Sequence, residues 1–174
     1  MAQCLGRILV VDDEPVNVTV LRGILCHAGY EIMSAGSGAD AMALASFERP
    51  DMILLDVMMP GESGFDVCKR LKQEPSTTHI PIIFVTSLSD VSQKLMGLEL
   101  GAVDYITKPF FAPEVVARVR SHMDFQRHQC NIIEEQAKSK RLRGKNLRAL
   151  LIDGRGDMIR TCDIMLPKQA VATS

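Results

Sequence analysis

The sequence predicts an α/β fold: a five-stranded, parallel, doubly wound sheet with helices on both faces. The first observation is that short apolar runs alternate with segments of helical pattern over roughly the first 120 residues. Runs of this length and composition are typical of parallel strands that are buried on both faces. The second observation is that four of the runs stop at polar residues, namely Asp12-Asp13, Asp56, Thr86 and Lys108.

Ten elements are expected, in strict alternation of strand and helix. Pro15 suits the first turn of a helix, where its missing N–H needs no partner, and Gly29 suits the end of that helix. The second strand, which contains Glu31 and Ser34, is the most polar and is therefore expected at an edge of the sheet. The expected strands are at about 7–11, 30–35, 51–55, 81–85 and 103–107. The expected helices are at about 15–28, 38–47, 63–73, 89–100 and from 112 onward.

The domain organisation follows from length and charge. A chain of 174 residues suits one well-buried domain plus an extension. Residues 1–120 hold 15 acidic and 10 basic side chains, whereas residues 121–174 hold 6 acidic and 10 basic ones. This shift, together with the loss of strand-like runs, predicts a domain over 6–126, a helical, coiled-coil-like linker over 127–151 and a disordered tail over 152–174.

The last helix carries an apolar stripe that predicts an interface. Its members recur at a spacing near 3.5 residues, which is the period of a coiled-coil seam. We therefore expect the end of this helix to pair with a second copy of the chain, giving a homodimer. The stripe consists of Val116, Val119, Met123, Cys130 and Ile133.

Composition excludes several other classes of protein. No run approaches the roughly 18 to 20 apolar residues that span a bilayer, and the N-terminus has no signal-peptide pattern, so a cytoplasmic protein without membrane contact is expected. The five cysteines and four histidines stand at no zinc-binding spacing. The cysteines are expected to be reduced thiols. The histidines (His27, His79, His122 and His128) lack partners at useful spacing and are expected to be surface or boundary residues.

The polar residues at the strand ends predict phosphoryl chemistry. Ligands of open parallel sheets bind outside the carboxyl ends of the strands. The carboxylates of Asp12, Asp13 and Asp56 offer only oxygen ligands, which suits Mg²⁺ or Mn²⁺ better than zinc. Lys108 adds a positive charge and Thr86 a hydroxyl donor for a phosphoryl group, so that one carboxylate can become an aspartyl phosphate. No nucleotide-binding glycine loop is present, and nucleotide is not the expected donor.

Four motifs together resemble the receiver domain of bacterial two-component response regulators. They are the Asp12-Asp13 pair, Asp56 within LLDVMMPGESG, Thr86 within IIFVTSLSD and Lys108-Pro109 within DYITKPF. The resemblance covers roughly residues 6–126, and every signature position is filled. It implies a flavodoxin-like sheet with the strand order 2-1-3-4-5.

The resemblance also assigns a metal and a donor. It implies that Asp56 accepts phosphate from a histidine kinase or a phosphotransfer protein. Asp13 and Asp56 would bind Mg²⁺ directly, together with the main-chain oxygen of Met58, and Asp12 would act mainly through water.

Three more residues take roles from the same resemblance. Thr86 and Lys108 would hold the phosphoryl oxygens. Tyr105 matches the switch aromatic, which turns inward when Thr86 moves toward the phosphate. The Lys108-Pro109 bond would be cis.

Each motif alone has a simpler interpretation. An Asp-Asp pair after a strand often forms a helix cap or an Asx turn, and a Lys-Pro pair is often only a loop. Thr86 could cap the next helix, and Tyr105 could be an ordinary half-buried strand residue. Their joint occurrence at four strand ends, in the right order, favours a site.

The sequence says less about what phosphorylation of the domain would control. The leading hypothesis is a switch that changes protein–protein contacts and catalyses nothing beyond its own phosphorylation and dephosphorylation. A second hypothesis is the regulatory fragment of a larger response regulator whose nucleotide cyclase or phosphodiesterase domain is missing. A third, a DNA-binding regulator, depends on six basic residues within 138–148. No aromatic residue is interleaved with them and no recognition helix follows, so a nucleic-acid partner is not expected.

Overall fold

The computed structural model describes residues 4–87 and 97–142; from residue 130 onward, only the side chain of Ile132 is described. The chain divides into two compact units, Met1–Met123 and Asp124–Ser174, and the first contains the whole sheet. The predicted tail at 152–174 and the end of the predicted linker at 143–151 lie outside the described residues.

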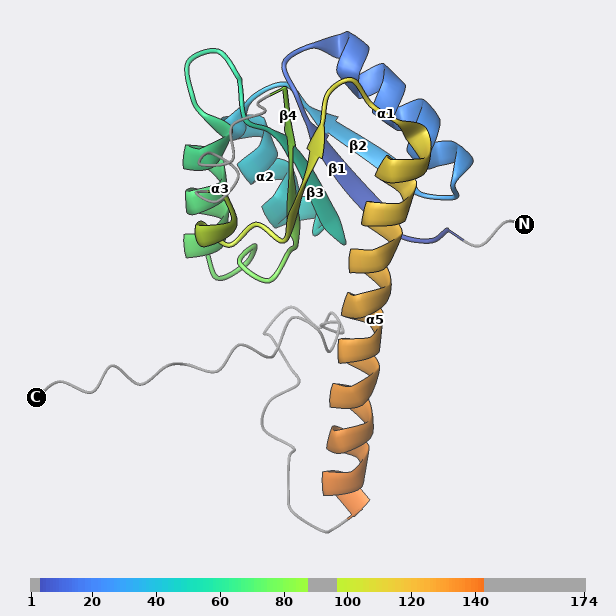
Figure 1. Cartoon of the computed structure of the whole chain (residues 1–174). Helices are drawn as coiled ribbons and strands as arrows, with labels where there is room; N and C mark the ends of the chain where they lie inside the picture. The colour runs from blue at the N-terminus through green and yellow to red at the C-terminus, as the bar shows by residue number, and fades with distance from the viewer. Residues whose placement is uncertain (1–3, 88–96, 143–174) are drawn as a thin grey trace, which may run out of the picture. The chain divides into compact units, whose positions relative to one another are not determined.

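The sheet has five parallel strands in the order β2-β1-β3-β4-β5 (Figure 1). Each strand begins and ends within about a residue of its expected position, and β2 lies at an edge as predicted. The strand order reverses between β1 and β3, because the chain adds β2 on one side of β1 and β3 to β5 on the other. The strands are β1 (Arg7–Val11), β2 (Glu31–Ala35), β3 (Met52–Asp56), β4 (Ile82–Thr86) and β5 (Asp104–Thr107).

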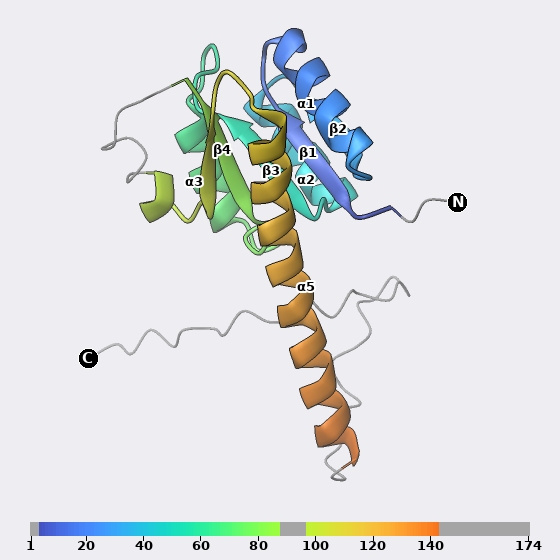
Figure 2. The ribbon, with the colours of Figure 1, turned by 45° about the vertical axis from the view of Figure 1, so that its right-hand side comes forward.

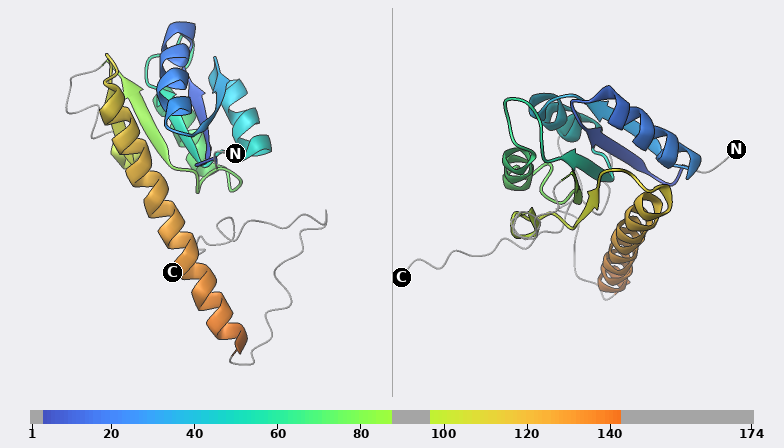
Figure 3. Two further views of the ribbon diagram at one scale, coloured as in Figure 1. Left: turned by 90° about the vertical axis from the view of Figure 1, so that its right-hand side faces the viewer. Right: turned by 45° about the horizontal axis from the view of Figure 1, so that its top comes forward.

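Helices cover both faces of this sheet (Figure 2, Figure 3). The described helices are α1 (Pro15–His27), α2 (Gly38–Glu48), α3 (Gly64–Gln73) and α5 (Ala112–Leu142). Ser37 caps α2 by accepting the Asp40 N–H at 3.2 Å, and Ser63 caps α3 by accepting the Phe65 N–H at 3.2 Å. Most of the helix expected at 89–100 lies outside the described residues; residues 97–99 are helical.

Alternation along the strands divides the core into two clusters. On β1, Leu9 and Val11 face α2 and α3, whereas Ile8 and Val10 face α1 and the start of α5. All four side chains are buried. Burial on both faces explains why these strands appear in the sequence as continuous apolar runs rather than as alternating patterns.

The first part of α5 corrects the predicted apolar stripe. Val115, Val119 and Met123, spaced four residues apart, are buried against the sheet, whereas Val116 is only half-buried. Val115 and Val116 lie about 40° and 60° around the helix from Val119, and packing against the sheet selects Val115 for the core face. Val119 and Met123 are therefore core residues of the first unit and not available to a partner. The side chains of Cys130 and Ile133 lie outside the described set.

In the second unit, α5 runs on to Leu142. Phe125 and Ile132 are exposed there, at 62% and 55% of their surface. Among the described residues, no helix combines the length and the apolar character needed to cross a bilayer.

Candidate functional site

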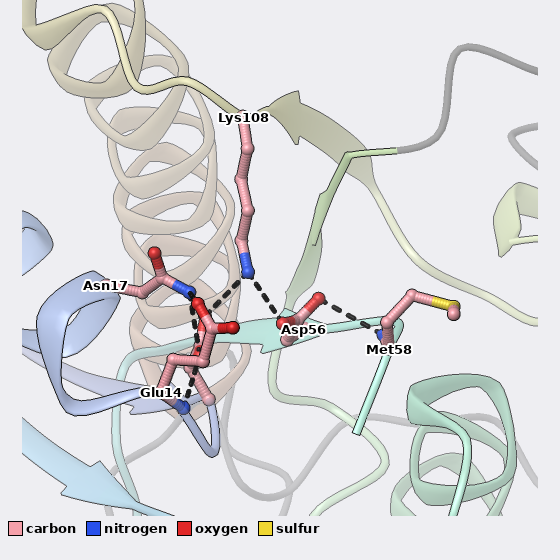
Figure 4. A network of polar contacts seen from close by, with 6 residues as sticks. Glu14, Asn17, Asp56, Met58 and Lys108 are labelled. Carbon is pink, nitrogen blue, oxygen red and sulfur yellow. Dashed lines mark hydrogen bonds and ion pairs between the residues drawn. The ribbon is translucent and has the colours of Figure 1, made fainter. Parts of the chain in front are cut away.

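The predicted site residues follow or close four strands at their carboxyl ends, and Figure 4 shows two of them, Asp56 and Lys108, side by side. Val11 pairs with Leu55, so the next residue on each strand, Asp12 and Asp56, reaches the same level of the sheet. Thr86 closes β4, and Lys108 directly follows β5. Because the strands are parallel, these four ends meet at one edge, where the strand order reverses between β1 and β3.

Lys108 connects the two buried carboxylates. Its Nζ donates to Asp56 Oδ2 at 2.7 Å and to Asp12 Oδ2 at 3.0 Å. Each aspartate exposes only 3% of its surface. The Lys108 backbone N–H donates to the Thr86 carbonyl oxygen at 2.9 Å, which fixes the start of this loop against β4. The lysine is therefore held both by its backbone and by its charge.

Asp12 is bound on both of its carboxylate oxygens. Oδ2 accepts from Lys108, whereas Oδ1 accepts from the Glu14 N–H at 2.9 Å and from Asn17 Nδ2 at 3.0 Å. The Glu14 contact is an Asx turn, which is the simpler interpretation of the Asp-Asp pair. That interpretation is correct locally, and the same carboxylate also faces Lys108 and Asp56.

Asp56 and Lys108 each shift the pKa of the other. Burial raises the pKa of the Asp56 carboxyl, the nearby Asp12 charge adds to the rise, and hydrogen bonds from Lys108 and the Met58 N–H oppose it. Burial alone would lower the pKa of Lys108, but its bonds to Asp56 and Asp12 outweigh burial and raise that pKa. The lysine stays an ammonium because it is attracted by two carboxylates, whereas each carboxylate shares one lysine.

The carboxylates fit a hard divalent cation. Asp12, Asp13 and Asp56 each offer one oxygen, and these atoms all lie within 4.8 Å of one another. Opposite ligands of an octahedral Mg²⁺ are about 4.2 Å apart, twice the Mg–O distance. The oxygens are thus close to the separation that one ion requires, and Asp13, which is only half-buried, leaves the group open on one side.

Thr86 and Tyr105 are placed near the site, but the structure does not test their predicted roles. Thr86 is buried at the end of β4, beside Thr107 of β5. Tyr105 is half-buried on β5, and the Arg118 guanidinium lies 5.5 Å from the centre of its ring. The Lys108-Pro109 bond is cis, as expected.

Two groups were missed by the sequence argument. Asn17 contacts Asp12, and it follows Asp12 by five residues, a spacing that the first turn of α1 brings within reach. Asp104 binds Arg118 through both oxygens, at 2.8 and 2.9 Å, and lies 3.2 Å from His122 Nε2. The expectation that His122 lacks a partner was therefore wrong.

Comparison with known proteins identifies the family. The family model described as the response regulator receiver domain matches residues 8–120. The chain belongs to the response regulator receiver family. This receiver is 41% identical over 158 residues to the response regulator PleD of Caulobacter vibrioides, covering 91% of this chain and 35% of PleD. It is 46% identical over 115 residues to the alkaline phosphatase synthesis transcriptional regulatory protein PhoP of Bacillus subtilis, covering 66% of this chain and 47% of PhoP. The chain thus spans between about a third and a half of these relatives.

Solved receiver structures agree with the fold. The signal receiver domain of a signal transduction histidine kinase from Syntrophus aciditrophicus is 37% identical with a TM-score of 0.63, over 68% of this chain and 90% of that one. The Vibrio cholerae chemotaxis protein CheY4 is 30% identical with a TM-score of 0.62, over 67% of this chain and 97% of that one.

Proposed function

We propose that this chain is a phosphoacceptor switch: Asp56 takes up a phosphoryl group, and protein–protein contacts change in response. The observation that carries the proposal is the position of Asp56. Its carboxylate is buried at the end of β3, hydrogen-bonded to Lys108, and within 4.8 Å of the Asp12 and Asp13 oxygens. In a family of receivers, this arrangement suits a carboxylate that becomes an acyl phosphate.

The chemistry uses groups at the carboxyl ends of the strands around Asp56. One Asp56 oxygen attacks phosphorus while the bond from phosphorus to the donor's leaving atom breaks. The Lys108 ammonium, now bonded to that carboxylate, offsets charge on the phosphoryl oxygens, and the Thr86 hydroxyl donates to them. Mg²⁺ or Mn²⁺, held by Asp12, Asp13, Asp56 and the Met58 main-chain oxygen, would supply further positive charge.

The donor in this proposal is a histidine kinase or a phosphotransfer protein. Such donors are the general partners of receivers. A chain that receives phosphate from them is expected in the cytoplasm. The chain itself would catalyse only its own phosphorylation and dephosphorylation. Its response would be a population shift in which Thr86 moves toward the phosphoryl group and Tyr105 turns inward.

The exposed residues of α5 suit a homodimer. Phe125 and Ile132 stand seven residues apart, which is two helical turns to within about 20°, so both lie on one face of the helix. A second copy presenting the same face would cover both side chains. The seam proposed is therefore Phe125 and Ile132, in place of the stripe that includes the buried Val119 and Met123.

Chemical phosphorylation tests the acceptor. Acetyl phosphate or phosphoramidate with Mg²⁺ should add a single phosphoryl group, as measured by intact mass. Asp56→Asn should abolish it, EDTA should prevent it, and Asp13→Ala should lose both metal binding and phosphorylation. Asp66→Asn, which changes an exposed aspartate of α3, is the matched control and should label like wild type. Stoichiometric labelling of Asp56→Asn would refute the assignment.

A further inference from the structure

We propose that Asn17 is a positioning residue of the receiver site: its amide holds the Asp12 carboxylate in the orientation that metal binding needs. The inference rests on the proposed function, because the orientation of Asp12 matters only if the acidic group binds a cation. It is carried by the hydrogen bonds around Asp12 and by the place of Asn17 in α1.

Asp12 is oriented from two opposite sides. Lys108 donates to Oδ2 at 3.0 Å, whereas the Glu14 N–H and the Asn17 amide donate to Oδ1 at 2.9 and 3.0 Å. Lys108 is shared with Asp56, at 2.7 Å, and in the proposed reaction it turns to the phosphoryl oxygens. The donors on Oδ1 belong to α1 and its entry turn, so they stay with Asp12 throughout the cycle.

The Asn17 amide suits this task because it is a neutral double donor. One N–H reaches Asp12 Oδ1, and the same nitrogen lies 2.9 Å from Glu14 Oε2 (Figure 4). The second contact fixes the amide itself. A basic side chain in its place would compete with the cation, whereas an acidic one would add to the repulsion among the carboxylates. The amide orients Asp12 and leaves its negative charge available to a metal or its bound water.

The backbone of Asn17 is as constrained as its side chain. Its N–H donates to the Glu14 carbonyl oxygen at 3.1 Å in the first turn of α1, two residues after Pro15. The side chain is half-buried. Little conformational freedom is left to lose when the cation arrives, so the contact acts by preorganisation.

A metal titration tests the role. In full-length protein, Mg²⁺ affinity would be measured from the amide NMR signals of residues 12–14 and 56–58. Asn17→Leu, which keeps the side-chain volume without the donor, should bind Mg²⁺ about tenfold more weakly, at the low end of the effect of losing an outer partner of a metal ligand. Asn17→Ala, which favours the helix, should behave alike. At saturating Mg²⁺, both should be phosphorylated by phosphoramidate at nearly the wild-type rate.

Two comparisons separate positioning from folding. Thr19→Val also removes a side-chain hydrogen bond from α1, to the Pro15 carbonyl oxygen, and should leave Mg²⁺ affinity unchanged. In an Asp12→Ala background, adding Asn17→Leu should cause no further loss of affinity, because Asn17 acts through Asp12. Wild-type affinity in Asn17→Leu, or losses that simply add in the double variant, would overturn the inference. Wild-type protein that binds Mg²⁺ but gains no phosphate on Asp56 would instead refute the proposed function alone.

Discussion

At the scale of single residues, the balance between burial and hydrogen-bond donors decides the pKa of a carboxyl group. Asp56 and Asp104 are both shielded from water, and burial is the largest influence on each. For Asp56, the effect of burial exceeds that of the hydrogen bonds, and the pKa is raised. For Asp104, burial is outweighed by donors from the Tyr105 N–H, Arg118 and His122, and the pKa is lowered. Asp56 and Asp104 therefore differ in the direction of their pKa shifts, although both are hydrogen-bonded.

The lowered pKa of Asp104 predicts a pH-dependent stability. A carboxyl whose pKa falls below its ordinary 3.8 on folding stabilises the fold above that pH, and the contribution is lost as pH falls through the folded-state value. Asp104→Asn should therefore lower the free energy of unfolding at pH 7 by about 1–2 kcal/mol. The gap to wild type should narrow below about pH 4. Urea unfolding across pH measures both effects.

Glu114→Gln is the control for this prediction. It removes the half-buried i,i+4 partner of the same arginine, Arg118, and should cost about 0.5 kcal/mol or less. If Asp104→Asn lost stability equally at pH 3 and pH 7, the charge of Asp104 would not be the cause.

Sequence reasoning found some site residues and missed others for a physical reason. Asp12, Asp56 and Lys108 were predictable because each follows an apolar run, and parallel strands bring their carboxyl ends together whatever their separation in sequence. Asp104 and Arg118 meet only because β5 packs on α5, and no local pattern encodes that contact. Asn17 is intermediate: its spacing from Asp12 is local, but its role depends on a rotamer that the sequence does not show.

At the scale of elements, the connection from β3 to α3 positions the acceptor. Gly64 opens α3, and its N–H donates to the Val57 carbonyl oxygen at 3.0 Å. A Cβ on Gly64 would overlap the Asp56 carbonyl oxygen and lie 2.9 Å from Val57 Cα. Both neighbours are backbone atoms and cannot turn aside, so the absence of a side chain lets α3 start against the acceptor strand.

Gly64→Ala should therefore shift the end of β3. We expect a loss of about 1–3 kcal/mol in the free energy of unfolding, the usual cost of overpacking, and slower phosphorylation by phosphoramidate. Gly23→Ala is the matched control, because a Cβ there meets nothing within 4 Å, and it should stabilise α1 by about 0.5–1 kcal/mol. A Gly64→Ala protein with wild-type stability and labelling would show that the connection can accommodate a Cβ at this position.

The elements also show which features a sequence pattern can predict and which it cannot. Strand positions were predicted closely, because runs such as 52–55 are apolar without interruption. On α5, the first member of the predicted stripe was wrong by one residue, since Val115 and Val116 are equally apolar and only packing against the sheet selects between them. A spacing of 3.5 residues fits Val116, which precedes Met123 by seven residues, whereas the helix packs Val115, Val119 and Met123 against the sheet.

At the scale of the whole molecule, contacts within the first unit join Tyr105, the residue of the proposed switch, to α5. Tyr105 of β5 lies beside Arg118 of α5, and Arg118 is bound to Asp104 on the same strand. A change in the orientation of Tyr105 would thus alter the surroundings of the ion pair between Asp104 and Arg118, which joins β5 to α5. The strand order was implied by family resemblance, whereas these contacts needed the structure, because they depend on side chains from two elements.

The proposed homodimer gives the last prediction. Phe125 and Ile132 expose apolar surface on one face of α5, and a second copy would bury both. With two apolar residues from each helix, the affinity should be modest, on the order of micromolar. Sedimentation equilibrium of the full chain should show a monomer–dimer equilibrium. Beryllofluoride with Mg²⁺ should shift it toward dimer, because in the proposed switch Tyr105 responds to the occupied site and Tyr105 lies beside Arg118 of α5.

Paired substitutions separate this seam from other contacts. Phe125→Gln with Ile132→Gln should give a monomer, whereas Arg127→Gln, about 200° around the helix from Phe125, should associate like wild type. The double variant should still be phosphorylated, since neither residue belongs to the site. A wild-type chain that stays monomeric at about 100 µM, far above a micromolar Kd, with and without beryllofluoride, would rule out the dimer. Phe125 and Ile132 would then be free to bind a different protein.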